Sequence, residues 1–178
     1  MKTITVALLG LATLFTANAY ADEGLTFGAS VGYVNIENSD PGFAFDANDT
    51  GYKFFASYTT PGFLGIEGGY VDFGSPEDVV GGFPGEIDAE GWNIYGVGNV
   101  PLSGGVDIFA KAGLVAWEAD SVIDGILVDT DDGTDLALGL GARWNSGDSF
   151  GLRAEIDWFD IDEADSVWMA SVGFEFRF

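Results

Sequence analysis

The sequence contains neither cysteine nor histidine among its 178 residues. Disulfide bonds, thiolate nucleophiles, imidazole bases and the usual zinc ligands are therefore excluded. Hydrolases that depend on a Ser-His or Asp-His pair cannot operate in such a chain. A carboxylate pair such as Glu67 and Glu155 could still exchange protons, but ion pairing is the commoner fate of such groups. We expect a protein that is not an enzyme and that uses no cofactor.

Basic residues are also scarce. Six Lys and Arg face 29 Asp and Glu, which gives a formal net charge of −23 at pH 7. This balance excludes nucleic acid as a partner, because phosphates require a basic surface. The excess of carboxylates predicts strong solvation in salt, association with cations, or both.

Long apolar runs are missing as well, since no segment reaches the roughly 18 apolar residues that a transmembrane helix needs. The apolar stretch at residues 4–15 follows Lys2 and precedes the small residues Ala19 and Ala21. This arrangement predicts a cleavable signal peptide over residues 1–21, with cleavage before Asp22. Residues 22–178 then form one exported domain, in which any membrane span must be a β-strand.

Eight runs of about ten residues alternate apolar and polar side chains. In the last run, Trp168, Phe174 and Phe178 alternate with Ser171 and Glu175. Strand side chains point to opposite faces with a period of two, so each run predicts a strand with one apolar face. The predicted strands are residues 25–36, 51–60, 63–73, 91–100, 106–117, 136–144, 150–159 and 167–178.

The connections between these runs are alternately short and long. Residues 61–62, 101–105 and 145–149 are short and rich in turn formers, whereas the other connections are longer and acidic. Short turns on one side and long loops on the other are typical of barrels that span a membrane. The pattern predicts an all-β fold, an eight-stranded antiparallel up-and-down transmembrane β-barrel.

Periodicity alone does not decide which face points inward, because a soluble ligand-binding barrel would place the apolar face inside. Three features favour an apolar exterior. Aromatic residues such as Tyr33, Trp92 and Trp144 lie near the strand ends, where membrane girdles are expected. Glycine and serine dominate the polar face, which suits the narrow interior of an eight-stranded barrel.

The third feature is the position of the charges. All basic residues after the leader fall on the polar face of predicted strands, together with five acids. A charge that faces lipid at the midplane costs about 2–4 kcal/mol for Arg or Lys, so these groups should point inward and pair. The predicted lumenal ion network consists of Lys53, Glu67, Lys111, Arg143, Arg153, Glu155, Asp157, Glu175 and Arg177. We expect Glu67, Lys111, Arg153 and Glu155 to plug the lumen at mid-height.

Most of the remaining acids lie in the four long connections, without a basic residue among them. Two interpretations remain open: a solvated, self-repelling surface, or carboxylates that bind divalent cations and so bridge to anionic lipopolysaccharide. Residues 129–135 resemble a calcium loop in composition, but their spacing does not match the EF-hand pattern. We therefore predict no defined metal site.

Several segments resemble the small OmpA-like outer-membrane β-barrel family. They are residues 65–74 (GIEGGYVDFG), 109–114 (FAKAGL), 152–157 (LRAEID) and 172–178 (VGFEFRF). The resemblance implies location in the outer membrane of a Gram-negative bacterium and insertion by the barrel assembly machinery. That machinery would recognise the aromatic last strand, with Phe174, Phe176 and Phe178. Outer-membrane lipids and lipopolysaccharide would surround a monomer.

These features together predict a role in envelope integrity or surface interaction, with a plugged polar lumen and acidic surface loops. Two alternatives remain open. The barrel could be a narrow gated channel for small solutes or ions, if the lumenal pairs rearrange. It could also be a secreted, soluble ligand-binding barrel, if the apolar face pointed inward.

Overall fold

A computed structural model describes residues 24–40, 43–80, 82–146, 149–161 and 164–178. The predicted signal peptide lies outside these residues. In the ranges described, no helix is long and apolar enough to cross a membrane.

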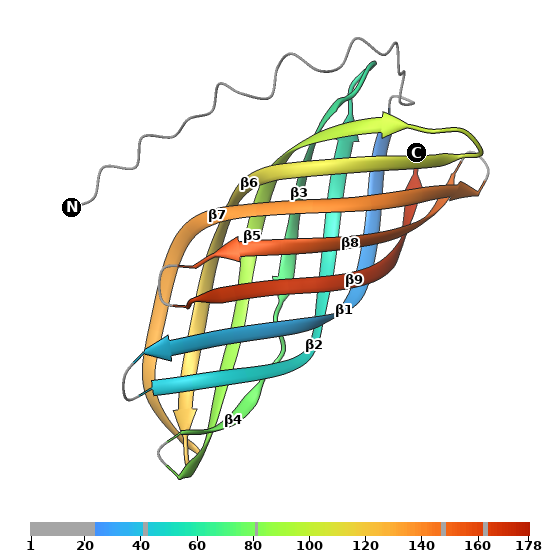
Figure 1. Cartoon of the computed structure of the whole chain (residues 1–178). Coiled ribbons are helices and arrows are strands. Elements are labelled where there is room, and N and C mark those ends of the chain that lie inside the picture. The colour runs from blue at the N-terminus through green and yellow to red at the C-terminus, as the bar shows by residue number, and fades with distance from the viewer. Residues whose placement is uncertain (1–23, 41–42, 81, 147–148, 162–163) are drawn as a thin grey trace.

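The described ranges contain nine strands. They are β1 (Gly24–Asp40), β2 (Phe43–Thr59), β3 (Leu64–Asp72), β4 (Glu77–Val80), β5 (Phe83–Pro101), β6 (Val106–Ile123), β7 (Ile126–Ser146), β8 (Phe150–Asp160) and β9 (Ser166–Arg177). All neighbouring strands pair antiparallel, in the order β3-β2-β1-β9-β8-β7-β6-β5-β4, and β3 also pairs with β5. The β3–β5 pairing closes a ring of eight strands and leaves β4 outside it (Figure 1). The predicted eight-stranded antiparallel up-and-down barrel is confirmed.

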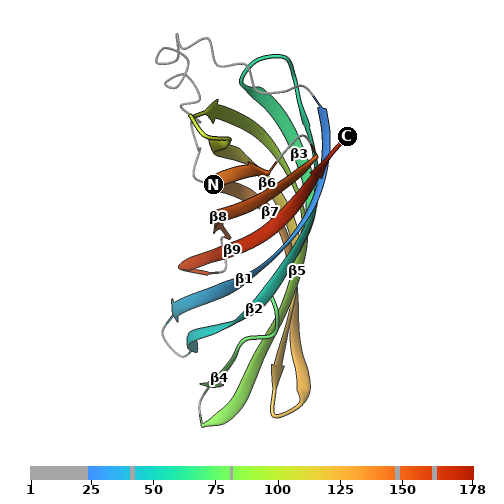
Figure 2. The ribbon, with the colours of Figure 1, turned by 90° about the vertical axis from the view of Figure 1, so that its right-hand side faces the viewer.

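The two ends of this barrel differ, as the predicted topology requires. Short turns and the C-terminus lie at one end, which we call the inner end, and the Phe178 amide there donates to the Leu25 carbonyl at 2.8 Å. At the opposite, outer end, the strands run on into long hairpins (Figure 2).

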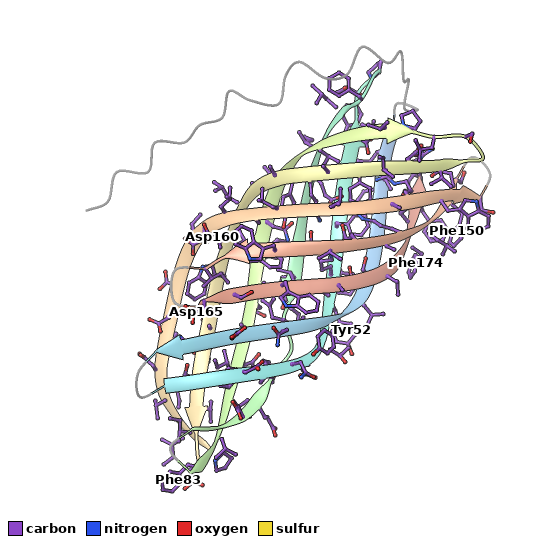
Figure 3. All side chains as sticks on the ribbon, in the orientation of Figure 1. Tyr52, Phe83, Phe150, Asp160, Asp165 and Phe174 are labelled. Carbon is purple, nitrogen blue, oxygen red and sulfur yellow. The ribbon has the colours of Figure 1, made fainter. Side chains whose placement is uncertain are left out.

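Side chains sort by parity along each strand, and the apolar set points outward. In β8 every second residue is exposed and the others are buried. Ile66, Ile94 and Leu140 are each more than 60% exposed, although they are large and apolar. Figure 3 shows this exterior, with Tyr52 and Phe174 among the labelled outward side chains. A secreted soluble barrel would need the opposite arrangement, because its exterior contacts water.

The predicted long loops were wrong at three of the four outer connections, where the structure has hairpin strands. β6 and β7 continue well beyond residues 117 and 136 and meet at a turn formed by Asp124 and Gly125. Both turn residues have positive φ angles, 52° and 75°, as a type I′ hairpin turn requires. Polar residues can continue a ladder in water, because both faces of the sheet are solvated there.

These continuations form a projecting sheet, the outer extension, made of β4 and the outer parts of β5, β6 and β7 (Figure 2). The Asp124 amide donates to the Pro84 carbonyl at 2.9 Å and thereby joins the two hairpin tips. Phe83 lies at the far tip in Figure 3 and is more than half exposed. Most of the acidic residues that we assigned to loops therefore lie on strands.

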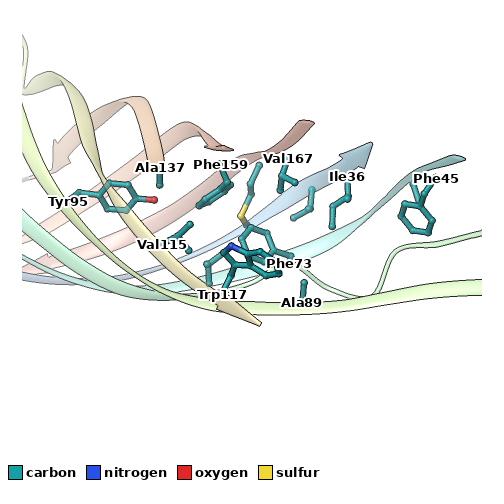
Figure 4. Packing of buried hydrophobic residues seen from close by; sticks show 14 of the residues in the cluster. Ile36, Phe45, Phe73, Ala89, Tyr95, Val115, Trp117, Ala137, Phe159 and Val167 are labelled. Carbon is teal, nitrogen blue, oxygen red and sulfur yellow. The ribbon is translucent and has the colours of Figure 1, made fainter. Parts of the chain in front are cut away.

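The lumen also differs from the expectation of a polar interior. Towards the outer end it holds buried apolar side chains, which we call the outer apolar cluster (Figure 4). Its main members are Val34, Ile36, Val71, Phe73, Val115, Trp117, Phe159, Val167 and Met169. The Phe73 and Phe159 rings meet edge to face with centroids 4.9 Å apart. The lumen is thus polar only from its middle to its inner end.

Candidate functional site: the ionic cluster of the barrel lumen

Six charged side chains from four strands meet inside the barrel, and we call them the ionic cluster. They are Lys53 on β2, Glu67 on β3, Lys111 on β6, and Arg153, Glu155 and Asp157 on β8. All six are buried, with exposed fractions of 5% or less. The three acids balance the three bases, as a low-dielectric interior demands.

Arg153 is the centre of the cluster. Its Nη1 and Nη2 atoms donate to Glu67 Oε2 and Oε1 at 2.6 and 3.0 Å, which is a bidentate pair. Its Nη2 and Nε atoms also donate to Glu155 Oε2, at 2.6 and 3.0 Å. One guanidinium therefore holds together carboxylates from two strands, β3 and β8.

The two lysines complete the cluster from the other side. Lys111 Nζ lies 3.1 Å from Glu67 Oε1, 3.1 Å from Glu155 Oε2 and 2.9 Å from Asp157 Oδ1. Lys53 Nζ contacts Glu155 Oε1 and Asp157 Oδ2. Each carboxylate therefore has at least two basic partners. Removal of any one charged side chain would leave a neighbouring buried charge without one of its partners.

Aromatic rings from the same face pack against the cations. The Arg153 guanidinium lies 4.3 Å from the ring centroids of both Phe55 and Phe109. Lys111 Nζ lies 4.4 Å from the ring centroid of Tyr95. Such contacts favour a desolvated cation, and they fix the position of the long side chains.

Gly139 on β7 leaves the space that the ionic cluster occupies. A Cβ atom at this position would lie 2.4 Å from Lys111 Cε and 2.5 Å from Asp157 Oδ1. Carbon atoms cannot approach so closely, so any larger residue must displace the Lys111–Asp157 pair. The glycines of the polar face thus serve lumenal packing.

The other predicted network residues lie nearer the inner end. Arg143 pairs with Glu175 through Nε and Oε1 at 2.5 Å, and its Nη1 donates to Asn99 Oδ1 at 3.2 Å. Arg177 Nη2 donates to Asn145 Oδ1 at 3.0 Å. The predicted set is therefore divided between the ionic cluster and a separate inner group, and Lys53 and Asp157 belong to the former.

Trp117 belongs to an apolar layer that the sequence analysis did not predict. Its side chain points into the lumen, where Nε1 donates to Asp135 Oδ2 at 2.7 Å. A Cβ at Gly133 would lie 2.9 Å from the Trp117 ring, so this glycine leaves the space that the indole fills. The signal was present in the sequence, because Val71, Phe73 and Trp117 share the inward parity of their strands. Apolar residues of that parity near the outer ends predict an apolar layer.

The segment predicted to guide assembly lies at the inner end of β9 and just beyond it. Phe174 and Phe176 point outward, and their rings meet with centroids 5.9 Å apart. The Phe178 ring packs edge to face on Phe27 at 5.9 Å and is 80% exposed. The three rings form part of an aromatic band on the exterior.

The ionic cluster is a buried, charge-balanced set of ion pairs. Within the described part of the chain, no group of three or more acidic side chains is placed to hold a metal ion. The charged groups of the cluster contact one another, and the outer apolar cluster lies between them and the outer end of the lumen.

Comparison with known proteins gives the same fold. Neisserial surface protein A superposes with a TM-score of 0.73 at 13% identity, over 87% of this chain and 97% of that one. Ail, the attachment invasion locus protein of Yersinia pestis, gives 0.59 at 20% identity, over 88% and 100%. The N-terminal barrel domain of OprF from Pseudomonas aeruginosa gives 0.61 at 16% identity, over 88% and 98%.

No curated protein sequence matches the chain. A family model described as the outer membrane protein beta-barrel domain, however, matches residues 4–178. The resemblance to small outer-membrane barrels that the sequence motifs suggested is confirmed. The chain belongs to the family of outer membrane protein beta-barrel domains.

Proposed function

We propose that this protein is a non-conducting, monomeric barrel of the bacterial outer membrane that supports the envelope and presents an acidic surface. Family membership implies the outer-membrane location. The observation that supports a closed lumen is the ionic cluster, because its seven ion-pair contacts join buried groups from both walls of the barrel. The role is structural, with no catalysis.

Two barriers in series support a closed lumen. A permeating ion would first have to separate charge pairs such as Glu67–Arg153, whose rupture leaves buried charges at a cost of several kcal/mol. It would then meet the outer apolar cluster, where Phe73 and Phe159 are about 1% exposed. Apolar constrictions exclude ions because they offer no replacement for water.

Planar-bilayer recordings test this proposal against the gated-channel alternative. The wild-type barrel should show no steady conductance. Lys111→Met opens the ionic cluster, and Phe73→Ala opens the apolar one. Because the barriers act in series, we expect each single variant to stay silent and only the double variant to conduct.

A steady conductance of the wild-type protein would overturn the proposal. An increase with Lys111→Met alone would favour the narrow gated channel, since the ionic cluster would then be the only gate. Ala112→Met, an outward substitution on β6, is the matched control and should leave the recordings unchanged.

The surface role rests on a row of carboxylates at the base of the outer extension, from β3 to β7. Asp72, Glu90, Glu118 and Asp132 are directly opposite one another on β3, β5, β6 and β7. Like charges so placed repel, unless cations screen them. We propose that divalent cations bridge this row to the anionic lipopolysaccharide around the barrel.

A chelator tests the cation bridge. Removal of divalent cations from outer-membrane vesicles should increase proteolytic cleavage of the outer extension, and Glu118→Gln should reduce that increase by removing the central charge. Equal cleavage of both proteins, with and without chelator, would contradict the bridge.

We further propose that the exported chain is inserted by the barrel assembly machinery through its last strand. Exposed aromatic rings at Phe174, Phe176 and Phe178 support this proposal, because they stand on the surface that the machinery would contact. Phe178→Ser should lower the folded fraction recovered from outer membranes, whereas Phe63→Ser, which removes an exposed aromatic at another strand, should not.

A further inference from the structure

An apolar groove of about 770 Å³ crosses the outside of the barrel over β1, β9, β8 and β7 and reaches β6. Its floor is one row of paired residues whose side chains point to the lumen: Gly32, Ser171, Glu155 and Gly141. The strands that carry this row lie side by side towards the viewer in Figure 1. The groove therefore runs across the strands, not along them.

Two rows of outward side chains form its walls. One wall consists of Tyr33, Ala170, Ile156 and Leu140, and the other of Val31, Val172, Ala154 and Ile108. The small Ala154 and Ala170 side chains lie opposite larger ones and open the middle of the groove. At a strand spacing of about 4.8 Å, five strands give a length of about 19 Å.

The groove lies between the aromatic bands of the exterior and is tilted. Its β1 end is at Tyr33, whose ring lies 5.5 Å from that of Trp168 near the outer end. Its β6 end is at Ile108, close to the inner start of that strand at Val106. A molecule that fills it would enter from the outer side and extend towards the inner end of the barrel.

A second, polar hollow of about 400 Å³ continues the groove at its outer end. The two share Val31, Gly32 and Tyr33, and the hollow adds Asn48 and Thr50 with Asp49 between them on β2. Both Asp49 carboxylate oxygens already accept backbone amide bonds, from Thr50 at 2.7 Å and Ser75 at 2.9 Å.

The polar side chains of Asn48 and Thr50, which line the hollow, suit an uncharged polar ligand. The lining of the hollow includes the Asn48 amide and the Thr50 hydroxyl but no basic residue. A phosphate would find no cation among the lining residues, whereas an ester, amide or hydroxyl group can bond to Asn48 and Thr50.

We propose that the groove and hollow together form a site for one lipid, with an acyl chain in the groove and its ester or amide group in the hollow. The apolar walls of the groove suit an acyl chain, and the polar groups gathered at its outer end suit the ester or amide that carries the chain. The occupant is lipopolysaccharide of the outer leaflet, because the polar hollow lies at the outer end. The inference rests on the outer-membrane location and is independent of the closed lumen.

Native mass spectrometry of the full barrel in detergent tests the site, with short-sugar lipopolysaccharide and dimyristoyl phosphatidylcholine as probes. Wild type should retain one lipopolysaccharide per barrel. Ala154→Phe and Ala170→Phe fill the groove and should each reduce retention at least tenfold. Ala112→Phe, an exposed position on β6 outside the groove, is the matched control and should retain the lipid.

Heat-dependent gel mobility identifies variants that fold. If the filled variants do not fold, Asn48→Leu with Thr50→Val tests the same site at its polar end and should weaken retention at least threefold. The proposal is overturned if wild type retains no lipid, or if groove and hollow variants retain as much as the control. Equal retention of phosphatidylcholine would overturn the assignment to lipopolysaccharide.

Discussion

Arg153 joins two strands that are not neighbours in the sheet, because its guanidinium reaches from β8 across the lumen to β3. Its fixed planar fork suits two carboxylates, whereas a lysine offers only a point charge. Because the cluster is buried, removal of Arg153 would leave Glu67 and Glu155 as desolvated charges without their main partner. The residue therefore links two walls of the barrel through paired charges.

Replacement of Arg153 by methionine should lower the free energy of unfolding by about 3–5 kcal/mol, because Glu67 and Glu155 keep their charges without their main partner. Urea titrations of the barrel in lipid vesicles measure this difference. The Arg153→Met/Glu67→Gln double variant removes the unpaired charge and should recover part of the loss. A single-variant loss below about 1 kcal/mol would contradict the role assigned to the cluster.

Gly139→Ala tests the packing of the same cluster from the opposite wall. The added methyl group would lie 2.4 Å from Lys111 Cε, so we expect a loss of about 1–3 kcal/mol in unfolding free energy. Gly96→Ala is the matched control, because its Cβ would meet only the Ala112 carbonyl oxygen, at 3.8 Å. Equal stability of the two variants would mean that the lumen accommodates more volume than the structure allows.

At the scale of the element, the outer extension combines a regular ladder with an unfavourable charge pattern. Glu118 is opposite Glu90 on one side and Asp132 on the other. Backbone pairing and the Asp124–Gly125 turn hold the strands together in spite of this repulsion. The stability of this sheet should therefore depend on ionic conditions more than that of the barrel does.

Asp78 links β4 to the neighbouring hairpin, because its Oδ2 accepts the Asp46 amide at 3.1 Å and its Oδ1 accepts the Val79 amide at 2.7 Å. These two backbone bonds hold the pKa of the Asp78 carboxyl below its ordinary value of 3.8. A lowered folded pKa means that the stabilisation is complete above pH 3.8 and is lost as the pH falls through the lower folded value.

The amide proton shifts of Asp46 and Val79 report this titration by nuclear magnetic resonance. Their midpoint should lie below pH 3.8, and Asp78→Asn should abolish the change. Amide exchange across β4 should be faster in Asp78→Asn than in wild type at neutral pH, with the difference disappearing in acid. A midpoint at or above 3.8 would show that the two bonds do not persist in solution.

At the scale of the whole molecule, closure of the ring at β3 and β5 leaves the eight barrel strands without a free edge within the membrane. Backbone groups in hydrocarbon must be paired internally, so a closed ring is the only sheet that can span a bilayer. Opening the ring requires many ladder bonds to break together, which makes the barrel resistant to unfolding.

The folded barrel should therefore migrate faster than the boiled protein on a gel run in cold detergent. Arg153→Met should lower the temperature at which the fast band disappears, since the ionic cluster braces β3 against β8. Ala112→Met, which faces outward, should not change it. A single band at all temperatures would contradict a closed barrel.

The apolar side of β9 was evident from the sequence, because a period of two is a local property of a strand. The same reasoning placed Lys53, Lys111 and Arg153 inward without knowledge of any contact. It failed at the outer ends, where Asp and Thr residues suggested loops and the Asp124–Gly125 turn actually continues the β6–β7 ladder. The geometry of the turn determines that the two strands continue as a hairpin at this point. The Asp-Gly pair between apolar residues is the sequence signal that indicates such a turn.

The sequence by itself thus determined the number of barrel strands, their two faces and the placement of the charges on the lumenal face, since these follow from local alternation and the cost of charge in lipid. Only the tertiary structure decided which charges meet. Glu67 and Arg153 are 86 residues apart, and ring closure and strand register bring them within 2.6 Å. The groove on the exterior has the same origin. Its walls are rows of side chains from different strands, and only the register of those strands aligns them.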